Sequence, residues 1–281
     1  MYEYLFLIIL GLIYLVVASI SDLRKREVLN WLSFSLIIFG LSYRGLYAIF
    51  NQDAGFFLYG LLGFSIFFIL AYLFYYARVF AGGDAKLLMG LGAVLSIGSG
   101  FLDNLILFII FVLLLFAAGS LWGLGYSLFL ALRCKKFPEE FKKQFEDNKI
   151  LFYSLLGLAV ILFLITIFFK LYSLSFFPVI ILLFPILYIY AKAVENACMI
   201  VEISGKEATI GDWLYEKIKI NGKVIKPNWE GLDEKEVELI KKYGKKVKIK
   251  QGIPFVPSFL FAFILFLLFK DNLLYFFGLL F

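Results

Sequence analysis

The chain of 281 residues contains no histidine and only two cysteines, Cys134 and Cys198. Without histidine it cannot build a Ser-His or Cys-His catalytic triad, nor the HExxH zinc site of metalloproteases. Two cysteines are also too few for a four-ligand Cys/His zinc site. A carboxylate-only Mg²⁺ or Mn²⁺ site stays open but has no sequence signature. We therefore expect neither a metal nor a cofactor.

The two cysteines are also poor candidates for a structural disulfide. They lie far apart in the sequence, and both are expected on the reducing side of the membrane described below. We therefore expect both thiols to stay free.

Charged residues are scarce, at 17%, whereas 63% of the chain is hydrophobic and 20% is aromatic. This apolar share is well above that of a soluble domain. Several apolar runs approach the roughly 20 residues that a helix needs to cross a bilayer. No basic region precedes the first run, which is unlike a cleaved signal peptide. Because helices satisfy their own backbone groups in lipid, the composition predicts an all-α polytopic membrane protein.

About eight transmembrane helices are predicted. The fourth, at residues 85–97, would rise only about 20 Å and is shorter than the roughly 30 Å hydrocarbon layer. Such a short segment would draw the residue before it, Asp84, below the membrane surface. The expected spans are residues 4–20, 28–50, 56–77, 85–97, 105–132, 150–169, 176–191 and 253–269.

Hydrophilic stretches divide the chain into five parts. A small α+β module is predicted before the last helix, with a hairpin at Asn221-Gly222, a helix over 233–243 and a strand over 246–250. The parts are a membrane core with spans one to five (1–132), a charged loop (133–149), two additional spans (150–191), the α+β module (192–252), and the final helix with its tail (253–281).

The positions of the basic residues predict the orientation in the membrane. If both termini lie outside, 24 of the 27 basic residues fall in cytoplasmic segments. Arg44, Lys170 and Lys270 are the three on the outer side. The asymmetry accounts for the net charge of +6 without a nucleic-acid partner. We therefore expect a multi-pass plasma-membrane protein with its N- and C-termini outside.

Two aspartates lie at the predicted cytoplasmic face. Asp22 ends the first apolar segment, and Asp84 follows Gly82 and Gly83 on a turn between two apolar segments. Two carboxylates that share one proton supply an acid and a base, so that water can attack a peptide bond without a nucleophilic side chain or a metal. The pattern predicts an aspartyl protease. Lys86 either anchors the chain at the interface or tunes Asp84.

Two motifs carry a resemblance to a known family. The run Asp22-Leu23-Arg24-Lys25-Arg26-Glu27-Val28-Leu29-Asn30 resembles the first-aspartate motif of the type IV prepilin peptidases. Gly82-Gly83-Asp84-Ala85-Lys86 resembles their second-aspartate GxGD motif. The similarity is greatest to the archaeal preflagellin (archaellin) and prepilin peptidases, in which a cytoplasmic module precedes a final helix that opens with a segment like residues 252–257.

The resemblance implies a function. Asp22 and Asp84 would catalyse removal of a short basic leader from archaellin or pilin-like precursors, which would be the partners besides the lipid bilayer. Departures from the pattern are Ala81 in place of the first glycine, which predicts a less permissive turn, and Leu29 where many bacterial members have proline. The resemblance implies a core of at least six helices, to which the spans at 150–191 are additional. The cysteine-rich N-terminal domain of the bacterial members is absent, which weakens the expectation of N-methyltransferase activity.

Three alternatives remain. A presenilin-type or signal-peptide-peptidase-type protease would carry its first aspartate deeper, in a later span. A secondary transporter would place carboxylates near the midplane, often within an inverted repeat, and no repeat is visible here. A non-catalytic membrane scaffold would leave the pairing of the two aspartates as coincidence. No sequence feature specifies an oligomeric state.

Overall fold

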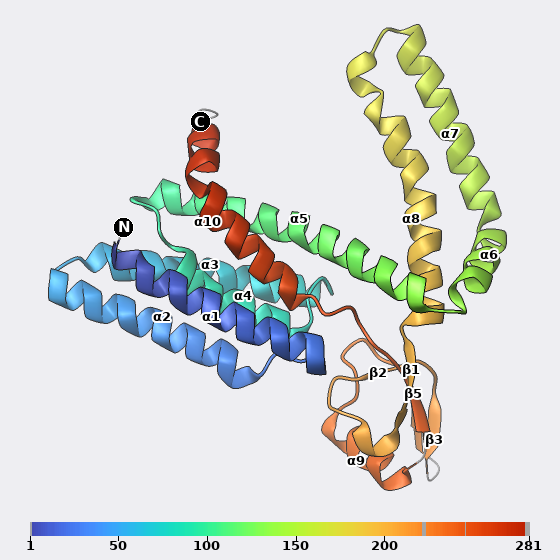
Figure 1. Ribbon diagram of the computed structural model, residues 1–281, viewed down its shortest axis with the longest axis horizontal. Coiled ribbons are helices and arrows are strands. Elements are labelled where there is room, and N and C mark those ends of the chain that lie inside the picture. The colour runs from blue at the N-terminus through green and yellow to red at the C-terminus, as the bar shows by residue number, and fades with distance from the viewer. Residues whose placement is uncertain (1, 221–222, 245, 279–281) are drawn as a thin grey trace. The chain divides into compact units, whose positions relative to one another are not determined.

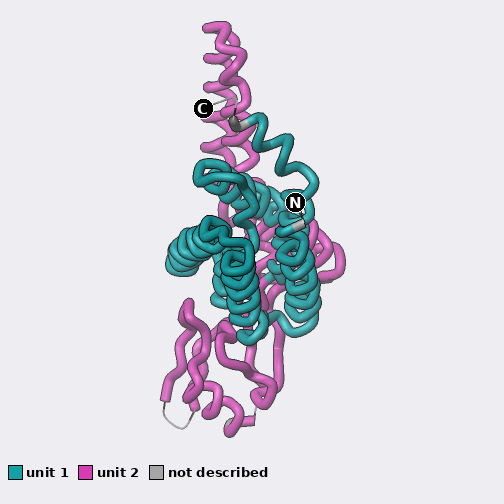
Figure 2. The backbone as a smooth tube through the Cα atoms, turned by 90° about the vertical axis from the view of Figure 1, so that its left-hand side faces the viewer, with its two compact units in different colours: residues 1–124, 253–281 teal, residues 125–252 magenta. Residues whose placement is uncertain are grey.

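The computed structural model describes residues 2–220, 223–244 and 246–278 (Figure 1). The described residues are mostly helical, and five short strands form a small α+β part near the C-terminal end. This architecture confirms the predicted all-α polytopic class. The chain divides into two compact units, residues 1–124 with 253–281 and residues 125–252 (Figure 2).

Seven of the described helices are long and apolar enough to cross a membrane. The fourth predicted span is the short helix α4 (Gly82–Leu95), whose 14 residues rise only about 21 Å. The seven long helices and α4 together correspond to the eight expected spans. The long helices are α1 (Tyr2–Lys25), α2 (Asn30–Asn51), α3 (Ala54–Tyr76), α5 (Phe101–Arg133), α7 (Lys149–Phe168), α8 (Phe176–Cys198) and α10 (Val256–Gly278).

Helix α4 is the most enclosed helix of the first unit, and it packs against α2 and α3. Small residues allow this close packing. A Cβ atom on Gly63 of α3 would lie 2.3 Å from the carbonyl oxygen of Gly92 on α4, and one on Gly90 would meet the Leu36 side chain of α2 at 2.9 Å. Glycines at such crossings let helix backbones approach closely. Helix α4 therefore fits into the core only because these positions are glycines, which carry no side chain.

Arg44 explains how α4 can end inside the protein. This side chain is fully buried, and its guanidinium donates hydrogen bonds to the carbonyl oxygens of Ala93 (2.7 Å), Ser96 (2.6 Å) and Phe56 (2.9 Å). The carbonyls of a helix's last turn have no partner within the helix. Arg44 supplies that partner for α4, and Gly60 leaves room for its stem. Arg44 is thus a buried internal donor rather than a solvated outer charge.

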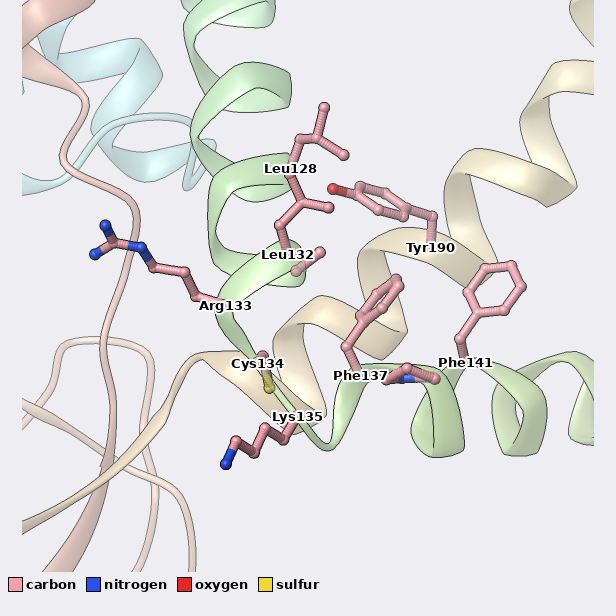
Figure 3. Close-up of a pocket in the computed structure, with 10 residues that line it drawn as sticks. Leu128, Leu132, Arg133, Cys134, Lys135, Phe137, Phe141 and Tyr190 are labelled. Atoms are coloured by element: carbon pink, nitrogen blue, oxygen red, sulfur yellow. The ribbon is translucent and has the colours of Figure 1, made fainter.

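The second unit contains the two additional spans, α7 and α8, which run side by side (Figure 1). The segment 133–149, expected as a charged loop, contains helix α6 (Phe137–Asp147). Its Phe137 ring packs edge-on against Tyr190 of α8, at 5.8 Å between ring centroids. These rings line a hollow of about 550 Å³. Figure 3 shows Leu128, Phe137 and Tyr190 pointing toward one another, while Arg133 points away. A short 3₁₀ turn, η1 (Tyr172–Leu174), joins α7 to α8.

The two cysteines lie close together at the two ends of the segment that contains α6, α7 and α8. Cys134 follows α5, and Cys198 is the last residue of α8. The Cys134 thiol donates a hydrogen bond to the carbonyl oxygen of Ala197 at 3.3 Å and also interacts with the Cys198 thiol. Both thiols are free, as expected. Their distance in sequence, however, was no guide to their distance in space, because α7 and α8 return the chain to its starting point.

The α+β part is built on strand β5 (Lys246–Lys250), which pairs antiparallel with β1 (Ile200–Ser204) and β2 (Trp213–Leu214). Strands β3 (Ile218–Ile220) and β4 (Lys223–Ile225) form the predicted hairpin, whose Asn221-Gly222 turn lies outside the described residues. The predicted helix is α9 (Glu234–Tyr243), which is capped by Asp233 and ends at Gly244 in a left-handed conformation. A 3₁₀ turn, η2 (Gly205–Glu207), follows β1.

Candidate active site

Asp22 lies in the last turn of α1 on the face that enters the core. Leu15 and Ala18 are buried on the same face, and the spacing of three and four residues continues the apolar stripe to Asp22. Asp22 is itself only 6% exposed. Its Oδ2 atom accepts a hydrogen bond from the backbone N–H of Val256 at 2.9 Å. A buried carboxylate needs such a donor, and here the donor is the first residue of α10.

Asp84 is the third residue of α4 and is half-buried. Its Oδ2 atom accepts a hydrogen bond from the backbone N–H of Ala81, the residue that caps the helix, at 3.3 Å. A carboxylate in this position satisfies one of the free N–H groups of a helix's first turn. The turn before α4 therefore fixes the backbone from which the Asp84 side chain projects.

The departure at Ala81 does not strain this turn. Ala81 has φ −70° and ψ 161°, an extended conformation that any residue adopts. The expectation that alanine makes the turn less permissive was therefore wrong. Gly83 is the glycine with a steric role, because a Cβ there would lie 3.1 Å from Cβ of Val28. At Gly82 the nearest atom would be 3.8 Å away, an ordinary contact.

The contact of Gly83 with Val28 brings the two aspartates to one site. Val28 lies in the connection between α1 and α2, six residues after Asp22, and Gly83 directly precedes Asp84. The charge of Asp22 acts on Asp84, so the two carboxylates are within electrostatic range of each other. The start of α4, the end of α1 and the start of α10 thus meet within the first unit.

Two basic residues near the aspartates, Lys86 and Arg26, make separate contacts. Lys86 donates a hydrogen bond from Nζ to Oδ1 of Asn30 at 2.8 Å, which joins α4 to the start of α2. Arg26 has a left-handed backbone with φ 58°, and its N–H donates to the carbonyl oxygen of Asp22 at 2.8 Å, where α1 ends. The charge of Arg26 also acts on Asp22. The site therefore combines two carboxylates with one cation beside the first of them.

Sequence reasoning missed the contribution of α10. Pro257 signalled a helix start, since proline is favoured in a first helical turn. Nothing in the sequence indicated that the free N–H of that turn would point at Asp22. The chemistry available is that of two carboxylates in range of each other. Among the described residues, no three His, Cys, Asp or Glu side chains are grouped closely enough to hold a metal ion.

Fold and site together define a polytopic helical membrane protein with paired carboxylates at one end of its core. Residues 9–128, which include both Asp22 and Asp84, match the model of the type IV leader peptidase family. This segment of the membrane core is therefore similar to the type IV leader peptidase family, and the resemblance seen in the two motifs is confirmed.

Curated relatives are preflagellin peptidases of methanogenic archaea. The chain is 39% identical over 87 residues to the preflagellin peptidase of Methanocaldococcus jannaschii and 35% identical over 86 residues to that of Methanococcus maripaludis. It is 31% identical over 86 residues to the preflagellin peptidase of Methanococcus voltae. Each match covers 31% of this chain, and 37%, 37% and 36% of the respective relatives. The chain thus matches just over a third of the length of these relatives.

Proposed function

We propose that this protein is a membrane-embedded aspartyl endopeptidase that removes the short basic leader from archaellin or pilin-like precursors. The observation that carries the proposal is the close approach of Gly83, beside Asp84, to Val28, which follows α1, because it puts Asp84 within electrostatic range of Asp22. Both aspartates lie inside the segment that matches the leader peptidase family. The names of the curated relatives support the substrate class. Cleavage would take place at the cytoplasmic face of the plasma membrane, where the predicted orientation puts both aspartates.

In the proposed mechanism, the two carboxylates share a single proton. The ionised member removes a proton from a water molecule, whose oxygen attacks the carbonyl carbon of the scissile peptide bond. The protonated member donates its proton to the leaving amide nitrogen, and the peptide bond breaks. Two carboxylates near each other cannot both ionise easily, which keeps one proton available at the site. The residues need no metal for this sequence of steps.

The other parts of the chain would serve this reaction. Residues 1–132 with the final helix would form the catalytic core in the membrane. The spans at 150–191 and the α+β module at 192–252 would be additions to it, with the module on the cytoplasmic side. Gly83 would support the turn that carries Asp84, as its contact with Val28 suggests. Gly82 and Lys86 would be supporting residues near the second aspartate.

The test is direct cleavage of a precursor. Purified protein in detergent or lipid is incubated with an archaellin or pilin precursor, and the product is identified by its mass. We expect a product shortened at the leader, and no product with the Asp22→Asn variant. A presenilin-type protease would cut such substrates within their transmembrane segment instead. A transporter or scaffold would leave the precursor intact, and that result would overturn the proposal.

A further inference from the structure

The first turn of α10 is held in place by helix α5. The indole Nε1 of Trp122 donates a hydrogen bond to the carbonyl oxygen of Pro254 at 2.7 Å. One turn earlier on α5, Gly119 leaves space for the ring of Phe255, because a Cβ there would lie 2.6 Å from the Cζ atom of that ring. Residues three apart on a helix share a face, so Gly119 and Trp122 form one seat for Pro254 and Phe255.

The ring of Phe255 is enclosed from the other side as well. It packs against the ring of Phe80 at 5.5 Å between centroids and edge-on against that of Phe259 at 5.8 Å. Phe80 is almost fully buried and directly precedes Ala81, the residue that caps α4. The ring thus lies between α5 and the chain that leads to Asp84. This packing leaves the Phe255 backbone little freedom to shift.

The peptide group between Phe255 and Val256 is planar, so the position of Phe255 directs the Val256 N–H. That N–H donates to Oδ2 of Asp22 at 2.9 Å. Pro257 follows and has no N–H, so it cannot donate to Asp22. The seat on α5 therefore determines where the donor for Asp22 lies.

We propose that Trp122 and Gly119 are positioning residues for the carboxylate pair. They hold the start of α10 so that the Val256 N–H fixes the Asp22 carboxylate in its catalytic orientation. This inference rests on the proposed function for its effect on turnover, although the seat itself can be tested without any substrate. Neither residue belongs to the aspartate motifs, and neither acts on substrate.

The test compares two identical substitutions on the same helix. Gly119→Ala places a methyl group against the Phe255 ring, whereas at Gly123, one turn further along α5, a Cβ meets nothing within 4 Å. Both variants gain the same helix propensity. We expect Gly119→Ala to lower kcat by ~10- to 100-fold with KM unchanged, since a small misplacement of a reacting group costs that much. Gly123→Ala should match the wild type.

A second measurement does not depend on activity. Hydrogen exchange of the Val256 amide should be faster in Gly119→Ala than in Gly123→Ala, because the hydrogen bond to Asp22 is lost. Trp122→Phe keeps an aromatic ring but removes the N–H donor to Pro254, and it should change kcat and exchange in the same direction. It also keeps the inference testable if Gly119→Ala does not fold.

The outcomes separate the two proposals. If the wild type and Gly123→Ala do not cleave a precursor, the proposed function fails, and amide exchange alone decides the inference. Equal exchange at Val256 in Gly119→Ala and Gly123→Ala would overturn the inference. Faster exchange with an unchanged kcat would overturn it too, because the seat would then have no effect on the catalytic carboxylate.

Discussion

The backbone N–H of Val256 donates a hydrogen bond to the Asp22 carboxylate at 2.9 Å, across 234 positions in the sequence. The first helix therefore provides the side chain that caps the last helix. A carboxylate at a helix N-terminus is stabilised by the free N–H groups and by the helix dipole. Asp22 has its hydrogen-bonded environment only when α10 is in place, so the first aspartate depends on both ends of the chain.

Replacing either aspartate by asparagine should abolish cleavage. Asparagine keeps the size of the side chain and one oxygen, but it cannot exchange a proton. We expect Asp22→Asn and Asp84→Asn each to lower kcat by at least ~10²- to 10⁴-fold, the usual contribution of general acid–base catalysis. Precursor cleavage followed by mass spectrometry measures the loss. The double variant should be no worse than either single one, because the two residues act as a unit.

Asp147→Asn is the matched control for this series, because Asp147 is an exposed carboxylate at the end of α6. It should cleave at the wild-type rate. The wild-type rate should rise and then fall with pH as the pair passes through its singly protonated form, with apparent pKa values that belong to the pair. Substantial cleavage by either single asparagine variant would contradict the shared-proton mechanism.

Chelation of metal ions should leave the activity unchanged. The chain has no histidine, and the proposed dyad activates water without a Lewis acid. Cleavage is measured before and after dialysis against excess EDTA, and then after addition of Mn²⁺ or Zn²⁺. Activity that disappears with EDTA and returns with a metal would indicate a carboxylate–metal hydrolase instead.

The α+β module should lie on the cytoplasmic side. A variant with both native cysteines replaced by serine can carry a single new cysteine at Lys223, an exposed position in β4. A membrane-impermeant maleimide should label it only after the cells are permeabilised. The matched control is a cysteine at Lys170, an exposed position between α7 and η1, which should react in intact cells. Labelling at Lys223 from outside would refute the orientation and the leader-cleavage mechanism.

Replacing Arg44 by methionine should destabilise the membrane core. The change leaves the carbonyl groups of Ala93, Ser96 and Phe56 without their buried donor. Each unsatisfied buried group costs about 1–3 kcal/mol, so a loss of several kcal/mol is expected. Thermal unfolding in detergent measures it as a lower Tm. Lys170→Met, at an exposed cation, is the control and should leave Tm unchanged. An equal Tm for both variants would show that Arg44 does not hold α4.

Mild oxidation should link Cys134 to Cys198. Their thiols interact, and Cys134 is hydrogen-bonded to the residue before Cys198, so little backbone movement is needed to form the bond. Treatment with copper phenanthroline, which supplies the oxidant, should yield a cross-linked peptide pair in a non-reduced digest. Cys134→Ser should remove it. If both thiols of the oxidised wild type remain open to alkylation, the segment from α6 to α8 does not bring the two cysteines together as the structure shows.

Much of the candidate site follows from short-range sequence features. Asp22 continues the spacing of Leu15 and Ala18 along one face of α1, which places it at a helix end and toward the core. Asp84 follows two glycines at the start of an apolar helix, and its carboxylate reaches back to the helix cap. Such local patterns depend on helical periodicity and on the free N–H groups of a first turn, so they are readable without a structure.

Other features depend on contacts between distant segments. Arg44 was counted as an outer charge, although a cation within an apolar span is itself a signal of a buried role. The structure shows it inside, because the carbonyls that end α4 need a donor there. The short α4 itself is possible only where Gly63 and Gly92 permit a close crossing. No single segment of the sequence contains that information.

The sequence by itself determined the membrane class, the helical spans and the two aspartate motifs, because hydrophobicity and helical spacing act over a few turns of the chain. The tertiary structure alone decided that Gly83 packs against Val28, that Val256 supplies a donor for Asp22, and that Trp122 and Gly119 seat the start of α10. These relationships join residues up to 234 positions apart, and they arise from packing and from the need of buried polar groups for a partner.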